Sequence, residues 1–562
     1  MAYVNQDDLK VKVAKLHREG EERAAERIAQ KLGYEYVDLE KTPVSLEAVK
    51  VLPENEALDA KVAVIQSASS KIALAVANPE LPATKHIIEA LKKRYEVKVV
   101  IVSPSSLATA WRFYKFVKPE TENITGKVRI TKNRLEELRG RLTTLDAVKK
   151  EFAALDPAKS SPVVMVEIML AGALGLRASD IHTEAGDKKA KIRFRIDGLL
   201  HDVFDDFALP AYAALISRIK LLSNMKLNIR DEAQDGRFTI GLGDKDIEMR
   251  VAVIPAEFGE TIVMRILDPA ATLVGLPDLG LREDNLEIVK SALARPNGLI
   301  LNTGPTGSGK TTTLYAFLRT MNNPEVKIIT LEDPIEYRID GVEQTQVDEE
   351  SGYTFANGLR AIVRQDPDII LVGEVRDLET ADIALQASLT GHLVLSTLHT
   401  NDAVGAVPRL VNLGVKVVSI GPALALVIAQ RLVRVLCEHC KKPATLDTGT
   451  RAKIAALLDR LPAKVDVKKY KAGADGNYGV YEAVGCDQCN GIGYKGRVGI
   501  FEFLKGGPDL EESILKEASE VSLRALAKKQ EMVTMQEDGI LKVLTGKTTF
   551  KEVEGATGEI AW

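Results

Sequence analysis

The sharpest chemical signal in the sequence is a glycine-rich segment that begins at Gly304 and ends at Thr312. It reads GPTGSGKTT and fits the pattern GxxxxGK[ST], with the apolar run GLILNT before it and the helical pattern TTLYAFLRTM after it. Closely spaced glycines let a backbone turn tightly and direct several N–H groups at one point, and the positive end of a following helix dipole attracts an anion. The segment therefore predicts a site for phosphate groups. The residues predicted to form it are Gly304, Pro305, Thr306, Gly307, Ser308, Gly309, Lys310, Thr311 and Thr312.

Two side chains of this segment have the chemistry needed to bind a nucleoside triphosphate. The Lys310 ammonium group is expected to reach the β- and γ-phosphates. The Thr311 hydroxyl group is expected to ligate Mg²⁺, which prefers oxygen ligands in octahedral geometry. The alternative is a glycine-rich turn with a chance lysine, and the flanking strand and helix patterns argue against it. The predicted cofactors are ATP and Mg²⁺, and the predicted reaction is ATP hydrolysis.

Two acidic residues follow apolar runs further along the chain. Glu332 follows the run IITL and precedes Asp333 and Pro334. Hydrolysis needs a carboxylate that orients or deprotonates the attacking water, and the carboxyl end of a strand is a suitable place for it. Glu374 follows the run DIILVG, where an acid can hold the water shell of a metal ion. The alternatives are a solvated turn at Glu332 and an ordinary acidic strand end at Glu374. Both acids, with Lys310, are catalytic candidates.

Two histidines, His392 and His399, bracket the apolar run LVLSTL. Side chains alternate between the two faces of a regular strand, so residues seven apart point to opposite faces. At most one histidine is therefore expected to face the phosphates. We take His399 as the candidate that contacts the γ-phosphate. The alternative for each histidine is a structural role.

All four cysteines occur late in the sequence as two CxxC pairs. Cys437 with Cys440, and Cys486 with Cys489, supply the four thiolates of a closed, structural Zn²⁺ site. The pairs are further apart than the roughly 15 to 20 residues usual in compact zinc sites, so we expect zinc to join the two ends of an inserted segment. Free thiols are the alternative. Paired motifs also favour a reducing compartment over a disulfide framework.

Length and composition indicate an ordinary soluble protein of several domains. A chain of 562 residues is too long for one core, and about 100 to 200 residues per domain predicts three or four units. The 75 basic and 79 acidic residues nearly balance, which argues against a nucleic acid or anionic membrane partner. The charged N-terminal segment does not match a secretory signal, and the apolar stretch at 416–430 is shorter than the about 20 residues of a membrane span. We therefore expect no transmembrane segment, a cytoplasmic location, and membrane association only through a partner.

The elements that would position these residues fall into four regions. Residues 1–115 mix helical periods with short strands and predict a small α/β domain, while 116–161 are charged and predict a linker. Residues 162–270 predict a helix followed by alternating strands, which is typical of an antiparallel sheet with helices on one side. Residues 281–562 alternate short apolar strands with helices, as in a parallel sheet covered on both faces. The predicted fold class is multidomain α/β, with α+β domains before the catalytic domain.

These motifs, in this order, resemble those of the secretion ATPase family that powers type II secretion and the assembly of type IV pili. The phosphate loop is similar to that of the family, and TLEDPIEY, DIILVGEVRD and TGHLVLSTLHTNDA resemble its aspartate box, its second acidic motif and its histidine box. GYKGRVGIFEFL and MQEDGILKVLTGKTT are similar to its C-terminal segments. ASDIHTE, RFRIDG, QDGRF and MRVAVIPAEFGETIVMRIL resemble its second N-terminal domain, and YEYVDLE and LPENEAL its first. The resemblance covers nearly the whole chain.

The resemblance implies a RecA-like P-loop ATPase domain that carries a tetracysteine insertion at 437–489 and C-terminal helices. A PAS-like domain and a partner-docking domain would precede it. Glu332 would be the catalytic base, Glu374 would support the metal and water, and arginines of the preceding domain would sense the γ-phosphate, with solvated strand arginines as the alternative. The arginine candidates are Arg237, Arg250 and, as a third, Arg265.

The resemblance also implies an assembly and a place of action. The chain would form a homohexamer that drives an inner-membrane platform protein. It would sit at the inner face of the cytoplasmic membrane, held by a membrane-embedded partner of the first domain, and would not bind a specific nucleic acid.

Three other functions are open at this point. A pilus-retraction ATPase shares the loop and the boxes but generally lacks the first domain and the cysteine pairs, both of which the sequence predicts here. A motor on nucleic acid, such as a conjugation-type P-loop ATPase, would need a basic groove, which the charge balance does not favour. A nucleotide-gated scaffold would bind ATP without turnover, and the presence of both Lys310 and Glu332 argues against it.

Overall fold

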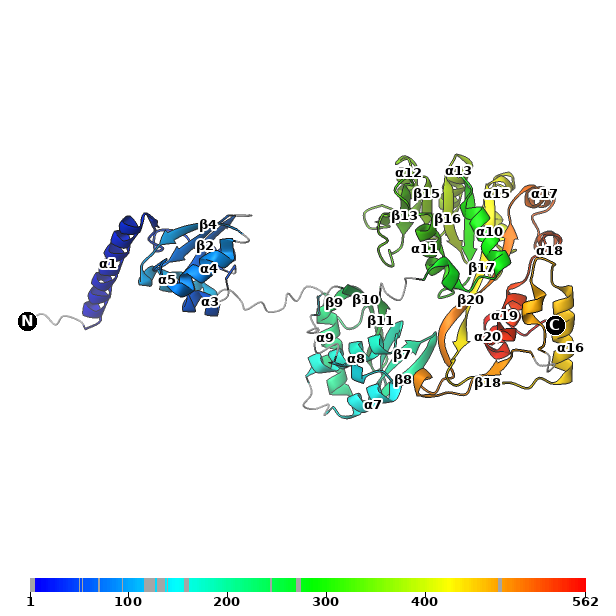
Figure 1. The fold of residues 1–562 in the computed structure, drawn as a ribbon, viewed down its shortest axis with the longest axis horizontal. Helices are drawn as coiled ribbons and strands as arrows, with labels where there is room; N and C mark the ends of the chain where they lie inside the picture. The colour runs from blue at the N-terminus through cyan, green and yellow to red at the C-terminus, as the bar shows by residue number, and fades with distance from the viewer. Residues whose placement is uncertain are drawn as a thin grey trace, which may run out of the picture. The chain divides into compact units, whose positions relative to one another are not determined.

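The chain forms two compact units, Met1–Ile124 and Thr125–Trp562, in a computed structural model. Figure 1 shows their helices and strands. None of the helices among the described residues combines the length and the apolar character that a membrane crossing needs. The structure describes residues 6–49, 51–52, 54–68, 71–92, 95–115, 127–128, 137–138, 140–155, 161–242, 245–268, 274–473 and 478–562.

The first unit is a small domain in which helices pack on a four-stranded sheet. Its elements are α1 (Gln6–Leu32), β1 (Glu35–Tyr36), α2 (Leu46–Val49), α3 (Glu54–Asp59), β2 (Val62–Ala68), β3 (Lys71–Val76), α4 (Pro82–Lys92), β4 (Glu96–Ile101), α5 (Pro104–Trp111) and the 3₁₀ helix η1 (Arg112–Lys115). The strand order is β1-β4-β3-β2, with β4 parallel to both neighbours and β2 antiparallel to β3. Glu22 accepts hydrogen bonds from the Ser103 and Ser106 hydroxyl groups at the start of α5, which ties α1 to the domain.

The second unit begins with an α+β domain, which we call the middle domain and whose described residues lie between 127 and 268. Its elements are β5 (Lys127–Val128), α7 (Leu145–Ala153), α8 (Pro162–Gly175), β6 (Asp180–Ala185), β7 (Lys189–Ile196), β8 (Leu199–Ala208), α9 (Leu209–Leu222), β9 (Gln234–Leu242), β10 (Lys245–Ala256) and β11 (Gly259–Leu267). The sheet has the order β5-β9-β10-β11-β6-β7-β8 and is antiparallel except for β5 beside β9. Alternate residues of β7 are buried, so one face of the sheet packs on the helices.

Part of the predicted linker belongs to the middle domain. The Thr144 side chain accepts a hydrogen bond from the Ala147 N–H and caps α7, and Val148 and Phe152 are buried in the domain core. These two apolar residues are four apart and so share one helix face, although charged residues surround them in sequence. Many other residues of 116–161 lie outside the described part of the chain, and a linker there stays a prediction.

The C-terminal domain, residues 274–562, contains a seven-stranded sheet with the order β14-β13-β15-β16-β12-β17-β20. Its elements are η3 (Leu276–Leu279), α10 (Glu283–Leu293), β12 (Gly298–Thr303), α11 (Lys310–Met321), β13 (Ile328–Glu332), β14 (Glu343–Gln346), α12 (Phe355–Val363), β15 (Ile369–Val372), α13 (Leu378–Leu389), β16 (Leu393–Leu398), α14 (Ala406–Asn412), α15 (Val417–Ala423), β17 (Leu424–Leu436), β18 (Lys442–Pro443), α16 (Thr448–Arg460), η4 (Val467–Tyr470), β19 (Tyr481–Glu482), η5 (Asp487–Cys489), β20 (Tyr494–Lys505), α17 (Pro508–Lys516), α18 (Glu520–Lys529), α19 (Met535–Leu544) and α20 (Phe550–Thr557). The strands are parallel except for β20, which is antiparallel to β17.

This sheet is buried on both faces, as its continuous apolar strands predict. Leu299 and Leu301 of β12 pack into a core with α12 and α13, whereas Ile300 packs into a second core with α10 and α11. Parallel strands end at the same edge of a sheet, so the residues that follow β12, β13, β15 and β16 are brought together there. The predicted multidomain α/β fold class is confirmed.

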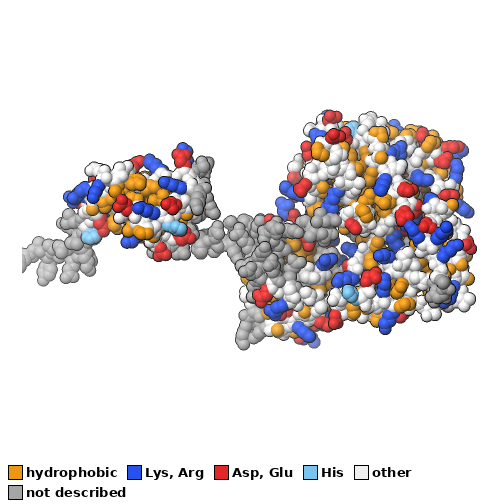
Figure 2. Space-filling model, in the orientation of Figure 1, with side chains coloured by type: hydrophobic (Ala, Val, Ile, Leu, Met, Phe, Trp, Pro, Cys, Tyr) orange, Lys and Arg blue, Asp and Glu red, His pale blue; other side chains and the backbone are white. Residues whose placement is uncertain are grey.

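The surface carries charges of both signs. Figure 2 shows Lys and Arg interspersed with Asp and Glu over the visible face of the second unit. This distribution agrees with the near balance of basic and acidic residues in the sequence.

Candidate nucleotide site and metal centre

The phosphate loop is the turn between β12 and α11. Gly304, Gly307 and Gly309 have φ angles of 153°, 79° and 89°, in the region that favours glycine. A Cβ atom at Gly304 would lie 2.6 Å from the Gln430 carbonyl oxygen, so a larger residue would displace the loop. α11 begins at Lys310, and N–H groups in the first turn of a helix have no intrahelical partner. The loop therefore has a backbone suited to an anion.

Two side chains of the loop, Lys310 and Ser308, carry hydrogen-bond donors. Lys310 Nζ donates hydrogen bonds to the carbonyl oxygens of Gly304, at 2.8 Å, and Pro305, at 3.1 Å. Burial lowers the pKa of Lys310, while the nearby Glu374 carboxylate acts in the opposite direction. The Ser308 hydroxyl group is buried and has no hydrogen-bond partner among the described residues. The ammonium group has three N–H donors and uses two of them here, so one remains for a bound phosphate.

Glu332 ends β13 and is held by three hydrogen-bond donors. Its side chain accepts hydrogen bonds from the Tyr315 hydroxyl group, from Thr330 Oγ1 at 2.5 Å and from Gln344 Nε2 at 3.2 Å. The residue is only 3% exposed, and this burial raises the pKa of Glu332 despite the hydrogen bonds. A fixed carboxylate with a raised pKa is suited to accepting a proton.

Glu374 and His399, from two neighbouring strand ends, lie together beside the loop. Glu374 follows β15, His399 follows β16, and His399 Nε2 is 3.3 Å from Glu374 Oε2. Glu374 also forms an ion pair with Arg376. At the other end of β16, His392 Nδ1 is 3.0 Å from the Ala387 carbonyl oxygen. Only His399 of the two histidines is therefore near the loop.

A cavity of about 870 Å³ joins these groups. Its wall includes part of the phosphate loop, the acids of the C-terminal domain, and residues of the middle domain. Of the predicted loop residues, Gly304, Pro305 and Ser308 are not in the wall. The wall residues with the relevant chemistry are Thr306, Gly307, Gly309, Lys310, Thr311, Thr312, Glu332, Glu374, Arg376, His399 and Arg497, with Asp180, Arg195 and Arg265 from the middle domain.

The three predicted arginines are cross-strand neighbours, but they do not all reach this cavity. Arg250 on β10 lies opposite Arg237 on β9 and Arg265 on β11. Arg265 lines both the loop cavity and an adjacent cavity of about 1100 Å³ that includes residues 334–338, whereas Arg237 and Arg250 line the adjacent cavity and not the loop cavity. Arg250 Nη2 donates a hydrogen bond of 2.5 Å to the Ile335 carbonyl oxygen.

Arg195 and Asp180 also line the cavity, although the sequence motifs do not predict them as site residues. Asp180 is 5% exposed, and its carboxylate lies 3.0 Å from Arg265 Nε and 3.4 Å from Arg195 Nε. One buried acid thus holds two arginines at the cavity. The signal was present in the segments ASDIHTE and RFRIDG, but their pairing depends on the register of β6 with β7 and β11.

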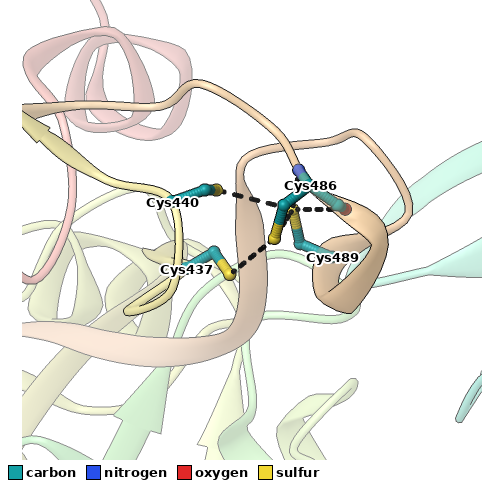
Figure 3. Close-up of side chains that lie close together, drawn as sticks. All are labelled: Cys437, Cys440, Cys486 and Cys489. Atoms are coloured by element: carbon teal, nitrogen blue, oxygen red, sulfur yellow. Dashed lines mark hydrogen bonds between the residues drawn. The ribbon is translucent and has the colours of Figure 1, made fainter.

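The four cysteines form a compact cluster. Their side chains come from two segments and point toward one another (Figure 3), with all four sulfur atoms within 4.8 Å of one another. Cys489 Sγ accepts hydrogen bonds from the N–H groups of Cys486 and Gly493, each at 3.2 Å. Burial acts to raise the pKa of Cys489, but these two N–H groups lead the opposing effects, which lower it to about 7. Four converging sulfur atoms and a stabilised thiolate fit a tetrahedral metal ion.

Comparison with known proteins identifies the family. The family model for the type II/IV secretion system protein matches residues 157–555. The chain belongs to this family. A second model, for the MshEN domain, matches residues 32–115 of this secretion system protein.

Curated relatives extend the match over nearly the whole secretion system protein. The type IV pilus assembly ATPase PilB of Myxococcus xanthus is 37% identical over 96% of this chain and 91% of its own length. The type II secretion system ATPase E of Vibrio cholerae is 44% identical over 72% of this chain and 77% of its own length. The predicted family resemblance is confirmed, and the family member described here is an ATP hydrolase.

The fold of this family member also matches a solved structure. The X-ray structure of the Legionella pneumophila ATPase DotB is 22% identical, with a TM-score of 0.51 over 71% of this chain and 97% of that one. This likeness concerns the fold alone.

Proposed function

We propose that the chain is a hexameric motor that hydrolyses ATP to assemble a type IV pilus or to drive type II protein secretion. The observation that carries the proposal is the cavity in which the phosphate loop and Glu332 meet Asp180, Arg195 and Arg265 of the middle domain. Because two domains supply its walls, the charge of a γ-phosphate can change how firmly the domains are held together. Hydrolysis cleaves the γ-phosphate from ADP, and release of the inorganic phosphate removes that charge and so produces movement.

Each part of the cavity has a proposed task. Lys310 and the loop N–H groups bind the phosphates, and Glu332 takes a proton from the attacking water. Mg²⁺, when bound by the Thr311 hydroxyl group, neutralises phosphate charge. Glu374 would orient the water molecules around the Mg²⁺ ion. It also fixes His399, whose imidazole contacts the γ-phosphate.

The motor is proposed to act on an inner-membrane platform protein from the cytoplasmic side. The first domain docks to a membrane-embedded partner and brings the hexamer to the inner face of the membrane. The presence of this domain and of the cysteine pairs supports assembly or secretion over pilus retraction. The mixed surface charge supports a protein partner over a nucleic acid.

Lys310→Ala tests the motor function in cells. A source strain that lacks the gene is complemented with wild type or with the variant at matched protein levels. We expect wild type to restore surface pili or secreted protein and Lys310→Ala to restore neither, because the loop loses its cation. Pili are counted by electron microscopy, and secreted protein is assayed in the medium. Pili or secretion at the wild-type level in the variant would overturn the proposal. The product restored by wild type distinguishes pilus assembly from secretion.

A second prediction concerns which arginine contacts the phosphates. Arg265→Ala is expected to lower kcat/KM for ATP by about 10- to 100-fold, since a hydrogen bond to a charged group contributes about 1.5–3 kcal/mol. Arg237→Ala, on the same sheet but outside the loop cavity, is expected to have a smaller effect. Steady-state phosphate release over a range of ATP concentrations measures both. A larger loss in Arg237→Ala would contradict the assignment of Arg265 as the arginine that contacts the phosphates.

We also propose that the four cysteines hold a structural Zn²⁺ ion. Elemental analysis of purified protein is expected to find one zinc per chain, and Cys489→Ser is expected to lose it. Because a closed site stabilises the fold it joins, the variant should also unfold at a lower temperature. Cys-to-Ser substitution with full retention of zinc would contradict the assignment.

A further inference from the structure

The cysteine cluster closes one end of a two-stranded ribbon formed by β17 and β20. Cys437 directly follows β17, and the Cys486–Cys489 segment precedes β20. The Cys437 N–H donates a hydrogen bond of 2.9 Å to the Gly493 carbonyl oxygen, which continues the pairing of the ribbon up to the cysteines. A metal ion at the cluster would therefore hold this end of the ribbon together.

The same ribbon forms part of the nucleotide cavity. Leu432 of β17 and Arg497 of β20 are in the cavity wall. Nearby on β17, the Gln430 side chain accepts hydrogen bonds from Thr313 of α11, at 2.8 Å, and from Asn302 of β12, at 2.9 Å. The ribbon thus joins the strand and the helix that flank the phosphate loop to the cysteine cluster.

The end of the ribbon at the cysteine cluster also contacts the middle domain through two reciprocal hydrogen bonds. Asn490 Oδ1 accepts a bond of 2.9 Å from the N–H of Leu145, the first residue of α7. Asp197 Oδ2, in the turn between β7 and β8, accepts a bond of 2.8 Å from the N–H of Gly496. The Leu145 N–H belongs to the first turn of a helix and needs an acceptor from outside the helix. Asn490 supplies one.

The position of Asn490 depends on the cysteine that precedes it. Cys489 Sγ accepts hydrogen bonds from N–H groups on both sides of Asn490, at Cys486 and Gly493. Asn490 itself has a φ of 54°, a left-handed conformation that Asn tolerates better than most residues. A sulfur atom fixed by a metal ion fixes these N–H groups in turn, and with them the direction of the Asn490 side chain.

We propose that metal binding by the four cysteines orders a docking face, formed by Asn490 and Gly496, that holds the middle domain beside the nucleotide cavity. Asn490 is then a positioning residue for the ATPase, acting through α7. Because the cavity needs walls from both domains, a chain with a loosened docking face has the assembled cavity for a smaller fraction of the time. Its apparent affinity for ATP is the intrinsic affinity multiplied by that fraction, and is therefore lower. The inference rests on the proposed metal site and on the proposed role of the two-domain cavity.

The test compares two substitutions of Asn490 in the full chain. Asn490→Gly removes the acceptor but keeps a residue that adopts the left-handed backbone, and Asn490→Asp keeps an acceptor. We expect Asn490→Gly to retain its zinc, to speed amide hydrogen exchange at the start of α7 by about tenfold, and to raise KM for ATP more than it changes kcat. Asn490→Asp should restore both properties. Gln488→Ala, an exposed position in the same turn, should behave as wild type.

A chelator supplies the second arm of the experiment. Stripping zinc from wild type should speed exchange at the start of α7 and in the turn at Asp197. Wild-type exchange in the stripped protein, or in Asn490→Gly, would overturn the proposal. A stripped preparation that hydrolyses ATP at the wild-type rate with a protected α7 would refute the ordering role of the metal and leave the ATPase function standing. A zinc-loaded chain with a protected α7 but no motor activity in cells would instead refute the proposed function.

Discussion

Replacing Glu332 with glutamine is expected to preserve ATP binding and to lower kcat by about 10²- to 10⁴-fold. The amide has nearly the same size and can still accept hydrogen bonds from Thr330 and Gln344, so the shape of the site is kept. It cannot accept a proton from water. Binding is measured with a fluorescent ATP analogue, and turnover by phosphate release at saturating ATP.

The neighbouring acid Glu336 provides the matched control for this substitution. It lines the same cavity and is 3.6 Å from Arg250, but it lies four residues beyond the end of β13 and is therefore less well placed than Glu332 to act as the base. Glu336→Gln should therefore change kcat much less than Glu332→Gln. If Glu332→Gln kept kcat within about tenfold of wild type, Glu332 would not be the base, and Glu374→Gln would be the next variant to measure.

The pH profile gives an independent check on the same residue. Burial raises the pKa of Glu332, and a base must be deprotonated to act. The kcat of wild type should therefore fall as the pH drops through a value above about 4.3, the ordinary pKa of glutamate. The residual activity of Glu332→Gln should lack this acidic limb. An unchanged limb in the variant would assign it to another group.

Much of this site follows from sequence because local rules determine it. The GxxxxGK[ST] spacing between an apolar strand and a helix indicates the phosphate loop from neighbouring residues alone. Glu332, Glu374 and His399 are far apart in the chain, yet each follows an apolar strand of a parallel sheet. The carboxyl ends of such strands meet at one edge, so their proximity could be predicted without knowing the strand order.

The arginines that line the nucleotide cavity could not be predicted in the same way. Whether Arg195, Arg237, Arg250 or Arg265 faces the loop depends on strand register in the middle domain and on how that domain packs against the C-terminal domain. A register shift of one residue moves a side chain to the other face of a sheet. The sequence contains the buried partner Asp180, but an isolated acid in a strand does not indicate which arginines it pairs with.

The cysteine site has one feature that local sequence predicts and another that depends on the tertiary fold. Two CxxC pairs indicate a metal site because few other functions need four thiols at that spacing, and the sulfur atoms do converge. The motif does not indicate which residues of the middle domain the metal-binding turn contacts. Asn490 and Asp197 are 293 residues apart in sequence numbering, and only folding reveals that both take part in one contact surface.

Asp538→Ala is expected to destabilise the C-terminal domain by about 3–5 kcal/mol. The Asp538 side chain is fully buried and accepts hydrogen bonds from Arg282 Nη1 at 2.6 Å, Lys542 Nζ at 2.5 Å and the Phe501 N–H at 2.9 Å. Removing the carboxylate leaves two buried cations without this partner. The free energy of local opening is measured by native-state hydrogen exchange at the amides of α19.

A surface ion pair in the same domain provides the control for Asp538. Asp509 lies 3.1 Å from Lys529, and both side chains are more than half exposed. Asp509→Ala should cost no more than about 1 kcal/mol, because solvent screens the pair. If the two aspartate variants lost equal stability, burial of the charge cluster would not explain the result.

Acid should reproduce the Asp538→Ala effect in wild type. Burial acts to raise the pKa of Asp538, but the Lys542 and Arg282 cations outweigh it and lower the pKa below its ordinary value of about 4. A carboxyl group whose pKa is lower in the folded than in the unfolded chain stabilises the fold above the unfolded pKa, and this contribution is lost as the pH falls toward the folded pKa. Hydrogen exchange at α19 should therefore show a difference in the free energy of local opening between wild type and Asp538→Ala at pH 6. This difference should become smaller below about pH 4. A difference that stayed constant down to pH 3 would show that the carboxylate charge is not what stabilises α19.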